Sequence, residues 1–319
     1  MRQTVKLALV TGVVAIIVVG TASIVTIEKK SGSSNKASAH TDVGLNETAN
    51  NQEQAGDTIP SRQTRISTDQ PSPAFKPGTK FAPEGLTVAD NTFVFDSRRV
   101  DVNGDGFVDD VVLIGEKQDN NNPYVQNISV SVKDGHTGKV STASIGELNV
   151  GLEPKFFIGS FSSAKYNDIL VSFATGGSGG VYQYALLTDQ DGQAVSTVPQ
   201  KKLNEGLPLE TQCFSGFVLK VTDRNTGYIA TIDLKKGSTD YQRLGIYNEK
   251  GELLQDPMIL IDGFGVLKPE LNGVGIYELH GIQRISVGAH ANSVANAESV
   301  WSVSNGQLKL LNENIKALN

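Results

Sequence analysis

The sequence predicts an all-β domain built from propeller-like repeats, and three observations support this prediction. Short segments rich in Val, Ile, Phe and Tyr alternate with turns containing Gly, Asp or Asn throughout residues 91–319. A loop with oxygen-bearing side chains at alternate positions leads into a β-branched run at residues 101–114. A weaker copy of this loop and strand occurs at residues 160–174. A two-sheet β-sandwich is the alternative architecture.

An apolar segment lies at the start of the chain. Residues 7–27 carry no charge, and a helix of this length, at about 1.5 Å per residue, would be about 31 Å long and could cross a bilayer. We therefore expect residues 1–30 to be a single-pass transmembrane anchor in the cell membrane, with the later residues outside the cytoplasm. The alternative is a signal sequence that is cleaved near Ala22, which would give a secreted protein.

The segment between the anchor and the domain has the composition of a disordered linker. Residues 31–90 are rich in Ser, Thr, Asn, Gln, Pro and Gly, so they offer little apolar surface to bury. Residues 91–319 then form the expected domain. The net charge of the chain is −6 and no basic cluster occurs, which argues against nucleic acid as a partner. The single cysteine, Cys213, excludes an intramolecular disulfide.

Within the domain, short strands are expected between turn signals. Residues 125–133 place Ile and Val on one face and Ser on the other, which is the period of two that indicates a half-buried strand. Further strands are expected at residues 92–95, 111–115, 155–161, 168–174, 181–187, 217–222, 228–234, 257–261, 276–285 and 300–303. Only residues 308–318 show a pattern that fits a helix.

The loop at residues 101–109 has the composition of a calcium site. Calcium binds about six to eight oxygen ligands from carboxylates, amides and backbone carbonyls. The expected ligands are the side chains of Asp101, Asn103, Asp105 and Asp109 and the backbone carbonyl of Phe107. Because these positions alternate along a tightly wound loop, their oxygen atoms can point to one centre. The sequence therefore predicts one bound Ca²⁺ ion.

The loop differs from an EF-hand in the segment after it. An EF-hand has a bidentate Glu at its twelfth position and then a helix. Val112 stands at that position here, inside a β-branched run, so the loop opens a strand. Gly106 provides the sharp turn, because glycine adopts positive φ without steric cost. The alternative interpretation is a turn rich in Asp, Asn and Gly that binds no metal.

A second loop aligns with the first but lacks most of its oxygen atoms. Residues 160–168 correspond to residues 101–109, and Asp168 is the only carboxylate retained. Lys165 places a positive charge where a cation would bind. We expect this second loop to keep its shape without binding calcium. It would mark a repeat, of which the domain would contain about four copies.

The calcium loop and several later segments resemble FG-GAP/VCBS repeats, as found in membrane-anchored proteins of spore-forming Gram-positive bacteria. Beyond the loop, the segments that carry this resemblance are residues 153–159, 167–172, 176–180, 277–279 and 283–285. The resemblance implies a β-propeller in the cell envelope, with a link to sporulation. It implies a non-enzymatic, calcium-binding structural or interaction module whose partners would be an envelope protein or polysaccharide.

The Gly-rich segment at residues 176–180 supports a different hypothesis. It matches the G-x-S-x-G pattern of serine hydrolases, with Ser178 as the nucleophile of an envelope hydrolase. That pattern requires a helix directly after the serine, whereas residues 181–187 read as a strand. A hairpin loop between two strands explains the segment more simply. Glu278, His280 and Arg284 form a polar row that is typical of the solvated face of a sheet.

Overall fold

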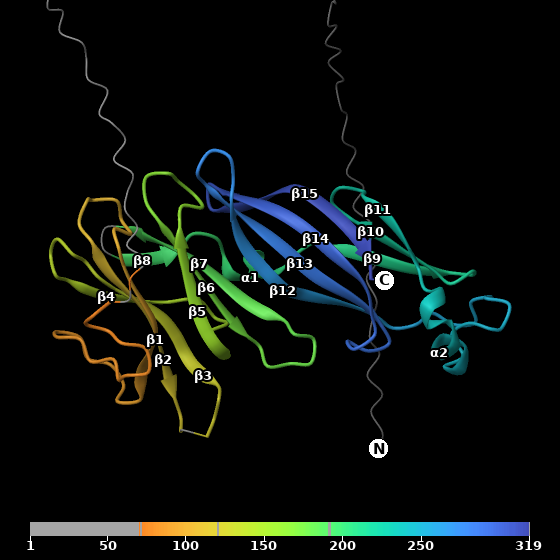
Figure 1. The fold of residues 1–319 in the computed structure, drawn as a ribbon, viewed down its shortest axis with the longest axis horizontal. Helices are drawn as coiled ribbons and strands as arrows, with labels where there is room; N and C mark the ends of the chain where they lie inside the picture. The colour runs from red at the N-terminus through yellow and green to blue at the C-terminus, as the bar shows by residue number, and fades with distance from the viewer. Residues whose placement is uncertain (1–69, 71, 120, 191–192, 319) are drawn as a thin grey trace, which may run out of the picture. The chain divides into compact units, whose positions relative to one another are not determined.

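The structure is a computed structural model that describes residues 70, 72–119, 121–190 and 193–318 (Figure 1). These residues belong to a compact unit that spans Gln63–Asn319. The anchor expected at residues 1–30 lies outside the described residues, as does most of the expected linker. Within the described part, no helix is both long and apolar enough to cross a membrane.

The domain is all-β, as predicted, and its described strands form four antiparallel sheets (Figure 1). In every sheet, neighbouring strands are also neighbours in sequence, so each sheet is a meander. The first sheet contains β1 (Thr92–Val100), β2 (Asp109–Lys117), β3 (Val125–Lys133) and β4 (Val140–Ser144). The second contains β5 (Leu152–Gly159), β6 (Asp168–Ala174), β7 (Tyr182–Gln190) and β8 (Gln193–Ser196), followed by helix α1 (Gln200–Asn204).

The later half of the domain contains the third and fourth sheets. The third sheet contains β9 (Leu209–Phe214), β10 (Val218–Asp223) and β11 (Ile229–Asp233). A short 3-10 turn (Lys235–Gly237) and helix α2 (Ser238–Arg243) come next. The fourth sheet contains β12 (Ile259–Leu271), β13 (Tyr277–Val287), β14 (Ser293–Ser304) and β15 (Gln307–Ala317). None of the four described sheets closes on itself. The propeller-like arrangement of the repeats stays a prediction.

Three hydrophobic cores hold the sheets together. The first core lies between the first and second sheets and includes Leu113, Ile128 and Val171. The second lies between the third and fourth sheets, around Leu219 and Ile285. A third core joins the second sheet to the fourth: its members include Leu170, Leu186, Phe264, Leu267 and Leu279. The second sheet is therefore covered on both faces, which explains why β6 is an almost continuous apolar run.

Three segments differ from the sequence prediction. Residues 308–318 are not helical: all but Leu318 lie in β15, where pairing with β14 satisfies the backbone. The strand expected at residues 257–261 is longer, since β12 extends to Leu271 through two register shifts against β13. Residues 72–90, expected in the linker, pack on β1 and β2, where Phe81 is buried against Val94 and Ile114.

Two hairpins of the domain have the same construction. In the β3–β4 hairpin, Asp134 Oδ1 accepts hydrogen bonds from the backbone N–H groups of His136 and Thr137. In the β10–β11 hairpin, Asp223 Oδ1 accepts the same bonds from Asn225 and Thr226. Both hairpins continue with a glycine at positive φ, Gly138 in the first and Gly227 in the second. They share the pattern D-x-x-T-G, which extends the internal repetition into the third sheet.

Candidate functional site

The loop predicted to bind calcium connects β1 to β2 and is held by its own acidic side chains. Asp101 accepts hydrogen bonds from the N–H groups of Gly104, at 2.6 Å, and Gly106, at 3.0 Å. Asp105 Oδ1 accepts from the N–H of Phe107 at 2.8 Å. Gly104 and Gly106 have φ values of 81° and 92°, so the loop needs glycine at both positions. Each acidic oxygen that accepts one N–H retains a second lone pair for another partner.

Asp109 lies beneath the loop and is fully buried. Its Oδ2 accepts a hydrogen bond from Val102 N at 2.9 Å, and its Oδ1 accepts one from Gly135 N at 2.8 Å. Burial raises the pKa of Asp109 to about 6, although both hydrogen bonds oppose this shift. The carboxylates of Asp105 and Asp134 raise the pKa further. Asp109 therefore ties the loop to the β3–β4 hairpin.

Asp134 also belongs to this site, although it was not predicted from the sequence. Its Oδ2 lies 3.3 Å from Asn103 Nδ2, which also lies 3.4 Å from Asp105 Oδ2. Hydrogen bonds from Thr137 lower the pKa of Asp134, so its carboxylate is ionised at neutral pH. The signal that could have revealed it is the Asp-Gly turn at the end of β3, because antiparallel strands bring that turn beside the β1–β2 loop.

These side chains border an open hollow of about 610 Å³. Its lining includes Asn103, Asp105, Asp134, Thr137, Lys139 and Gln190. Phe107 lies half exposed at the loop tip, where its ring stacks on His136 with centroids 4.4 Å apart. Across the described residues, no three His, Cys, Asp or Glu side chains are grouped closely enough to form a metal centre by themselves. A cation here would therefore depend on amide, carbonyl and water oxygen atoms as well.

The second loop reproduces the closing hydrogen bonds of the first. Asp168 is fully buried, and its Oδ2 accepts from the N–H groups of Phe161 at 2.9 Å and Ser162 at 2.8 Å. Burial raises the pKa of Asp168, and the hydrogen bonds from Ser162 and Phe161 oppose that shift. The two loops lie side by side, because Asn167 Nδ2 donates to the carbonyl of Asp101 at 2.9 Å.

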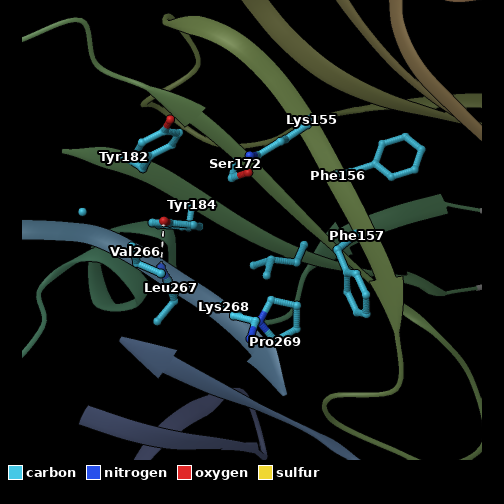
Figure 2. A pocket seen from close by; sticks show the side chains of 12 residues that line it. Lys155, Phe156, Phe157, Ser172, Tyr182, Tyr184, Val266, Leu267, Lys268 and Pro269 are labelled. Atoms are coloured by element: carbon cyan, nitrogen blue, oxygen red, sulfur yellow. Dashed lines mark hydrogen bonds between the residues drawn. The ribbon is translucent and has the colours of Figure 1, made fainter. Parts of the chain in front are cut away.

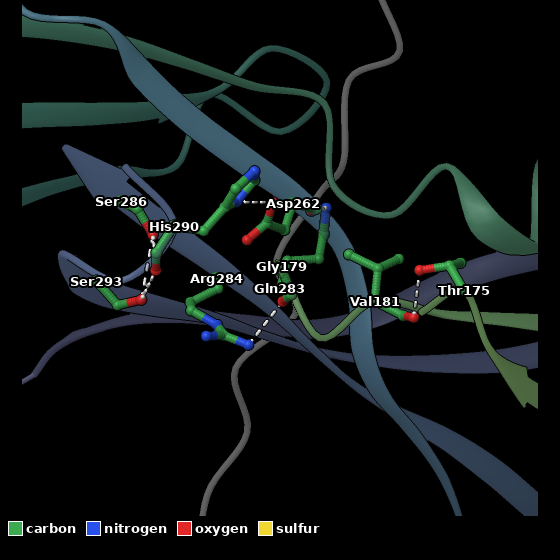
Figure 3. Close-up of polar contacts among 9 residues, drawn as sticks. All are labelled: Thr175, Gly179, Val181, Asp262, Gln283, Arg284, Ser286, His290 and Ser293. Atoms are coloured by element: carbon green, nitrogen blue, oxygen red, sulfur yellow. Dashed lines mark hydrogen bonds and ion pairs between the residues drawn. The ribbon is translucent and has the colours of Figure 1, made fainter. Parts of the chain in front are cut away.

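The Gly-rich segment is a hairpin loop between β6 and β7, so no helix follows Ser178. Ser178 is exposed and makes no hydrogen bond within the described residues. Beside the next residue, Gly179, His290 Nδ1 lies 2.8 Å from Asp262 Oδ1, and Arg284 Nη2 donates to the Gly179 carbonyl at 2.7 Å (Figure 3). Asp262 is buried, and its Oδ2 has no hydrogen-bond partner in the described structure.

The polar row on β13 does not form one site. Its side chains share a face, but each has a different partner. Glu278 accepts a hydrogen bond from Asn272, and His280 Nδ1 lies 3.5 Å from Glu270. Arg284 instead contacts the Gly-rich loop. Glu278 and His280 therefore contact the β12–β13 hairpin and β12, whereas Arg284 contacts a loop of the second sheet.

Comparison with known proteins gives one family match in the later half of the domain and one relative that aligns over a longer part of the chain. Residues 207–316 match the YybI C-terminal domain, so the match covers the third and fourth sheets and leaves out the β1–β2 loop. No solved structure matches the chain. The matching family is not one of FG-GAP or VCBS repeats, so the resemblance to those repeats stays a prediction. Over 222 residues, which are 68% of this chain and 81% of the relative, the chain is 29% identical to the uncharacterized protein YybI of Bacillus subtilis strain 168.

Proposed function

We propose that this protein is a non-enzymatic, calcium-binding structural or interaction module of the cell envelope. The observation that carries the proposal is the arrangement of oxygen atoms at the mouth of the β1–β2 loop. Asp101, Asn103 and Asp105 project from one loop whose backbone is fixed by its own side chains. The carboxylate of Asp134 adds a further oxygen from a neighbouring hairpin.

The residues present fit a hard cation. Calcium prefers carboxylate, amide and carbonyl oxygen, and the loop offers these without a competing sulfur or imidazole ligand. Asp101, Asn103 and Asp105 would hold the ion together with the Phe107 carbonyl. Asp109, which is buried below the loop, would add negative charge and one carboxylate oxygen. Burial is the main cause of the raised pKa of Asp109, and repulsion from Asp105 and Asp134 adds to it. A bound cation would offset that repulsion.

The repeated elements support a propeller-like arrangement as part of this proposal. Four successive antiparallel meanders follow one another along the chain, which is the order found in propeller blades. Each of two loop–strand units has a buried aspartate at the equivalent position, and each of two hairpins has a D-x-x-T-G turn. A pair of stacked sheets, as in a sandwich, is the alternative for the first and second sheets, which enclose one core.

The envelope location rests on the sequence. The apolar residues 7–27 would anchor the protein in the cell membrane and leave the domain outside, with release near Ala22 as the alternative. Calcium-binding modules outside the cell typically have dissociation constants of about 10⁻⁴–10⁻³ M, and this site would need no tighter binding. The partner would be an envelope protein or polysaccharide. The acidic net charge of −6 disfavours nucleic acid.

Thermal unfolding of the whole chain in detergent buffer tests the calcium site. At a free calcium concentration of about 100 times the dissociation constant, binding to the native state adds about 2.7 kcal/mol to the free energy of unfolding. We expect calcium to raise the midpoint, chelator to reverse the rise, and Asp105→Asn to abolish it. Glu249→Gln is the matched control, because Glu249 is exposed and lies outside the loop. An equal rise in Asp105→Asn and wild type would refute the site.

Hydrolysis through Ser178 is a second candidate that one observation favours. The Asp262–His290 pair lies beside Gly179, as an acid–base pair near a serine would. Treatment of the whole chain with a fluorophosphonate probe separates the candidates. A non-enzymatic module would not react, whereas a hydrolase would be labelled at Ser178, and both Ser178→Ala and His290→Ala would abolish that labelling.

A further inference from the structure

A groove of about 400 Å³ lies between the second sheet and β12 of the fourth (Figure 2). Its walls are mostly apolar and include Phe157, Leu170, Tyr182, Val266 and Pro269. This volume lies within the range of small-molecule sites, about 300–1,000 Å³. The groove shares no lining residue with the hollow at the β1–β2 loop, so a ligand bound in it would not depend on calcium.

Strand alternation explains why polar groups reach this groove. On β5, Phe156 borders the groove but belongs to the first core, and by alternation Lys155 and Phe157 lie on the opposite face of the strand. Lys155 is paired in register with Ser172 of β6, and Ser172 is paired with Tyr184 of β7. The three side chains therefore form a row across the sheet, and all three line the groove. Neighbours in such a row have Cβ atoms about 4.5–5.5 Å apart.

Each member of this row has a proton to donate. Ser172 is 9% exposed and its hydroxyl makes no hydrogen bond within the described residues. Tyr184 Oη accepts a hydrogen bond from Leu267 N at 2.9 Å, while its own proton has no acceptor in the described part of the chain. Burial raises the pKa of Tyr184 to about 12, so this proton remains in place at neutral pH. The row thus offers two hydroxyl donors and one ammonium group.

The charge of the groove is opposite to that of the chain. The chain carries −6, yet no Asp or Glu lines the groove. Lys268 at the rim is paired with Glu270 at 3.1 Å. Lys155 has no ion-pair partner in the described structure, and its Nζ lies 5.8 Å from the centre of the Tyr182 ring. An anion is therefore the complement of the polar row.

We propose that this groove binds a small carboxylic acid with an apolar body. The carboxylate accepts hydrogen bonds from Ser172 and Tyr184 and pairs with Lys155. The body lies against Phe157, Leu170 and Val266, which form the next positions along the same walls. A ligand with a hydroxylated ring fits less well, because its hydroxyl groups would face apolar side chains and lose their hydrogen bonds to water.

Calorimetric titration of the whole chain with 3-phenylpropionate tests the proposal. The matched ligands are 3-phenylpropanol, which lacks the charge, and glucuronate, which keeps the carboxylate on a hydroxylated ring. We expect 3-phenylpropionate to bind most tightly. Lys155→Met should weaken its binding about five-fold, because an exposed ion pair contributes up to about 1 kcal/mol. Lys165→Met, at an exposed lysine outside the groove, should leave its binding unchanged.

Tyrosine NMR locates the ligand without depending on a variant. In protein that contains fluorinated tyrosine, saturating 3-phenylpropionate should shift the fluorine signals of Tyr182 and Tyr184. The signal of Tyr228, which lies outside the groove, should not change. The proposal is overturned by an absence of binding, by equal binding of the alcohol, by tighter binding of glucuronate, or by shifts confined to other tyrosines. Calcium and chelator should give the same affinity, so failure of the calcium site and failure of the groove are distinguishable.

Discussion

At the scale of single residues, two buried aspartates close equivalent loops. Asp109 and Asp168 each begin a strand and accept an N–H bond from the residue after the loop's first position, Val102 in one case and Phe161 in the other. The alignment of the two loops predicted this equivalence. It could not predict that Gly135 donates to Asp109, because that contact depends on how a distant hairpin lies beside the loop. The ligand role of Asp109 stays a prediction.

Asp168 makes a pH-dependent contribution to stability. Its pKa is raised in the folded chain, so the native state binds the proton more tightly than the unfolded state does. The associated stability is fully present below the unfolded pKa of about 4 and is lost as the pH rises through the folded pKa. We expect the free energy of unfolding of the wild type, relative to Asp168→Asn, to fall as the pH rises above about 4. Urea titrations between about pH 3.5 and 7 measure this difference.

The control for that experiment is Asp240→Asn, because the Asp240 side chain is 68% exposed and pairs with Arg243 at the surface. Its difference curve against the wild type should show a much weaker dependence on pH. A flat Asp168 difference curve would contradict the expected shift, whatever the absolute stability of the variant.

At the scale of elements, the sequence predicted strands well where they are largely buried, as in β3 and β6, and poorly in β15, which is mostly exposed. The alternation of Ile and Val in β3 identified that strand correctly. β15 was mistaken for a helix because its leucines are spaced irregularly, and its strand state depends on pairing with β14. The D-x-x-T-G turns were visible in the sequence at Asp134 and Asp223. Their common role became clear only from their identical hydrogen bonds.

Gly281 shows how closely β12 and β13 pack. A Cβ atom at this position would lie 2.3 Å from Phe264 Cε1 and 2.8 Å from Ser299 Oγ. Because Phe264 is buried, its ring cannot move away freely. We expect Gly281→Ala to lower the free energy of unfolding by about 1–3 kcal/mol. Gly273→Ala, which adds a methyl group in open space, should change it by less than about 0.5 kcal/mol in chemical denaturation.

At the scale of the whole molecule, the third core makes the two halves of the domain dependent on each other. Leu170 and Leu186 come from the second sheet, and Phe264 and Leu279 come from the fourth. The sequence predicted strands that contain Leu170, Leu186 and Leu279, but none that contains Phe264. It could not predict which sheets face each other, because the pattern of one strand carries no information about its partner across a core. The all-β class was therefore predictable, and the stacking of the sheets was not.

This shared core should make unfolding a single transition. We expect Phe264→Ala to destabilise the domain by about 3–5 kcal/mol while calorimetry still shows one peak. Met258→Ala is the control, because Met258 is 61% exposed, and it should leave the midpoint nearly unchanged. Two peaks in the wild type, with only one sensitive to Phe264→Ala, would show that the halves unfold independently.

The contact between Tyr184 and Leu267 also affects self-association. β12 is an edge strand of its sheet, and unpaired N–H groups at such an edge can pair with a strand from another molecule. Here the Tyr184 hydroxyl occupies the N–H of Leu267, Pro269 has no N–H, and Lys268 places a charge between them. The N–H positions of Leu267 and Pro269 are therefore not available to a second strand, which disfavours edge-to-edge pairing along this part of the longest described strand.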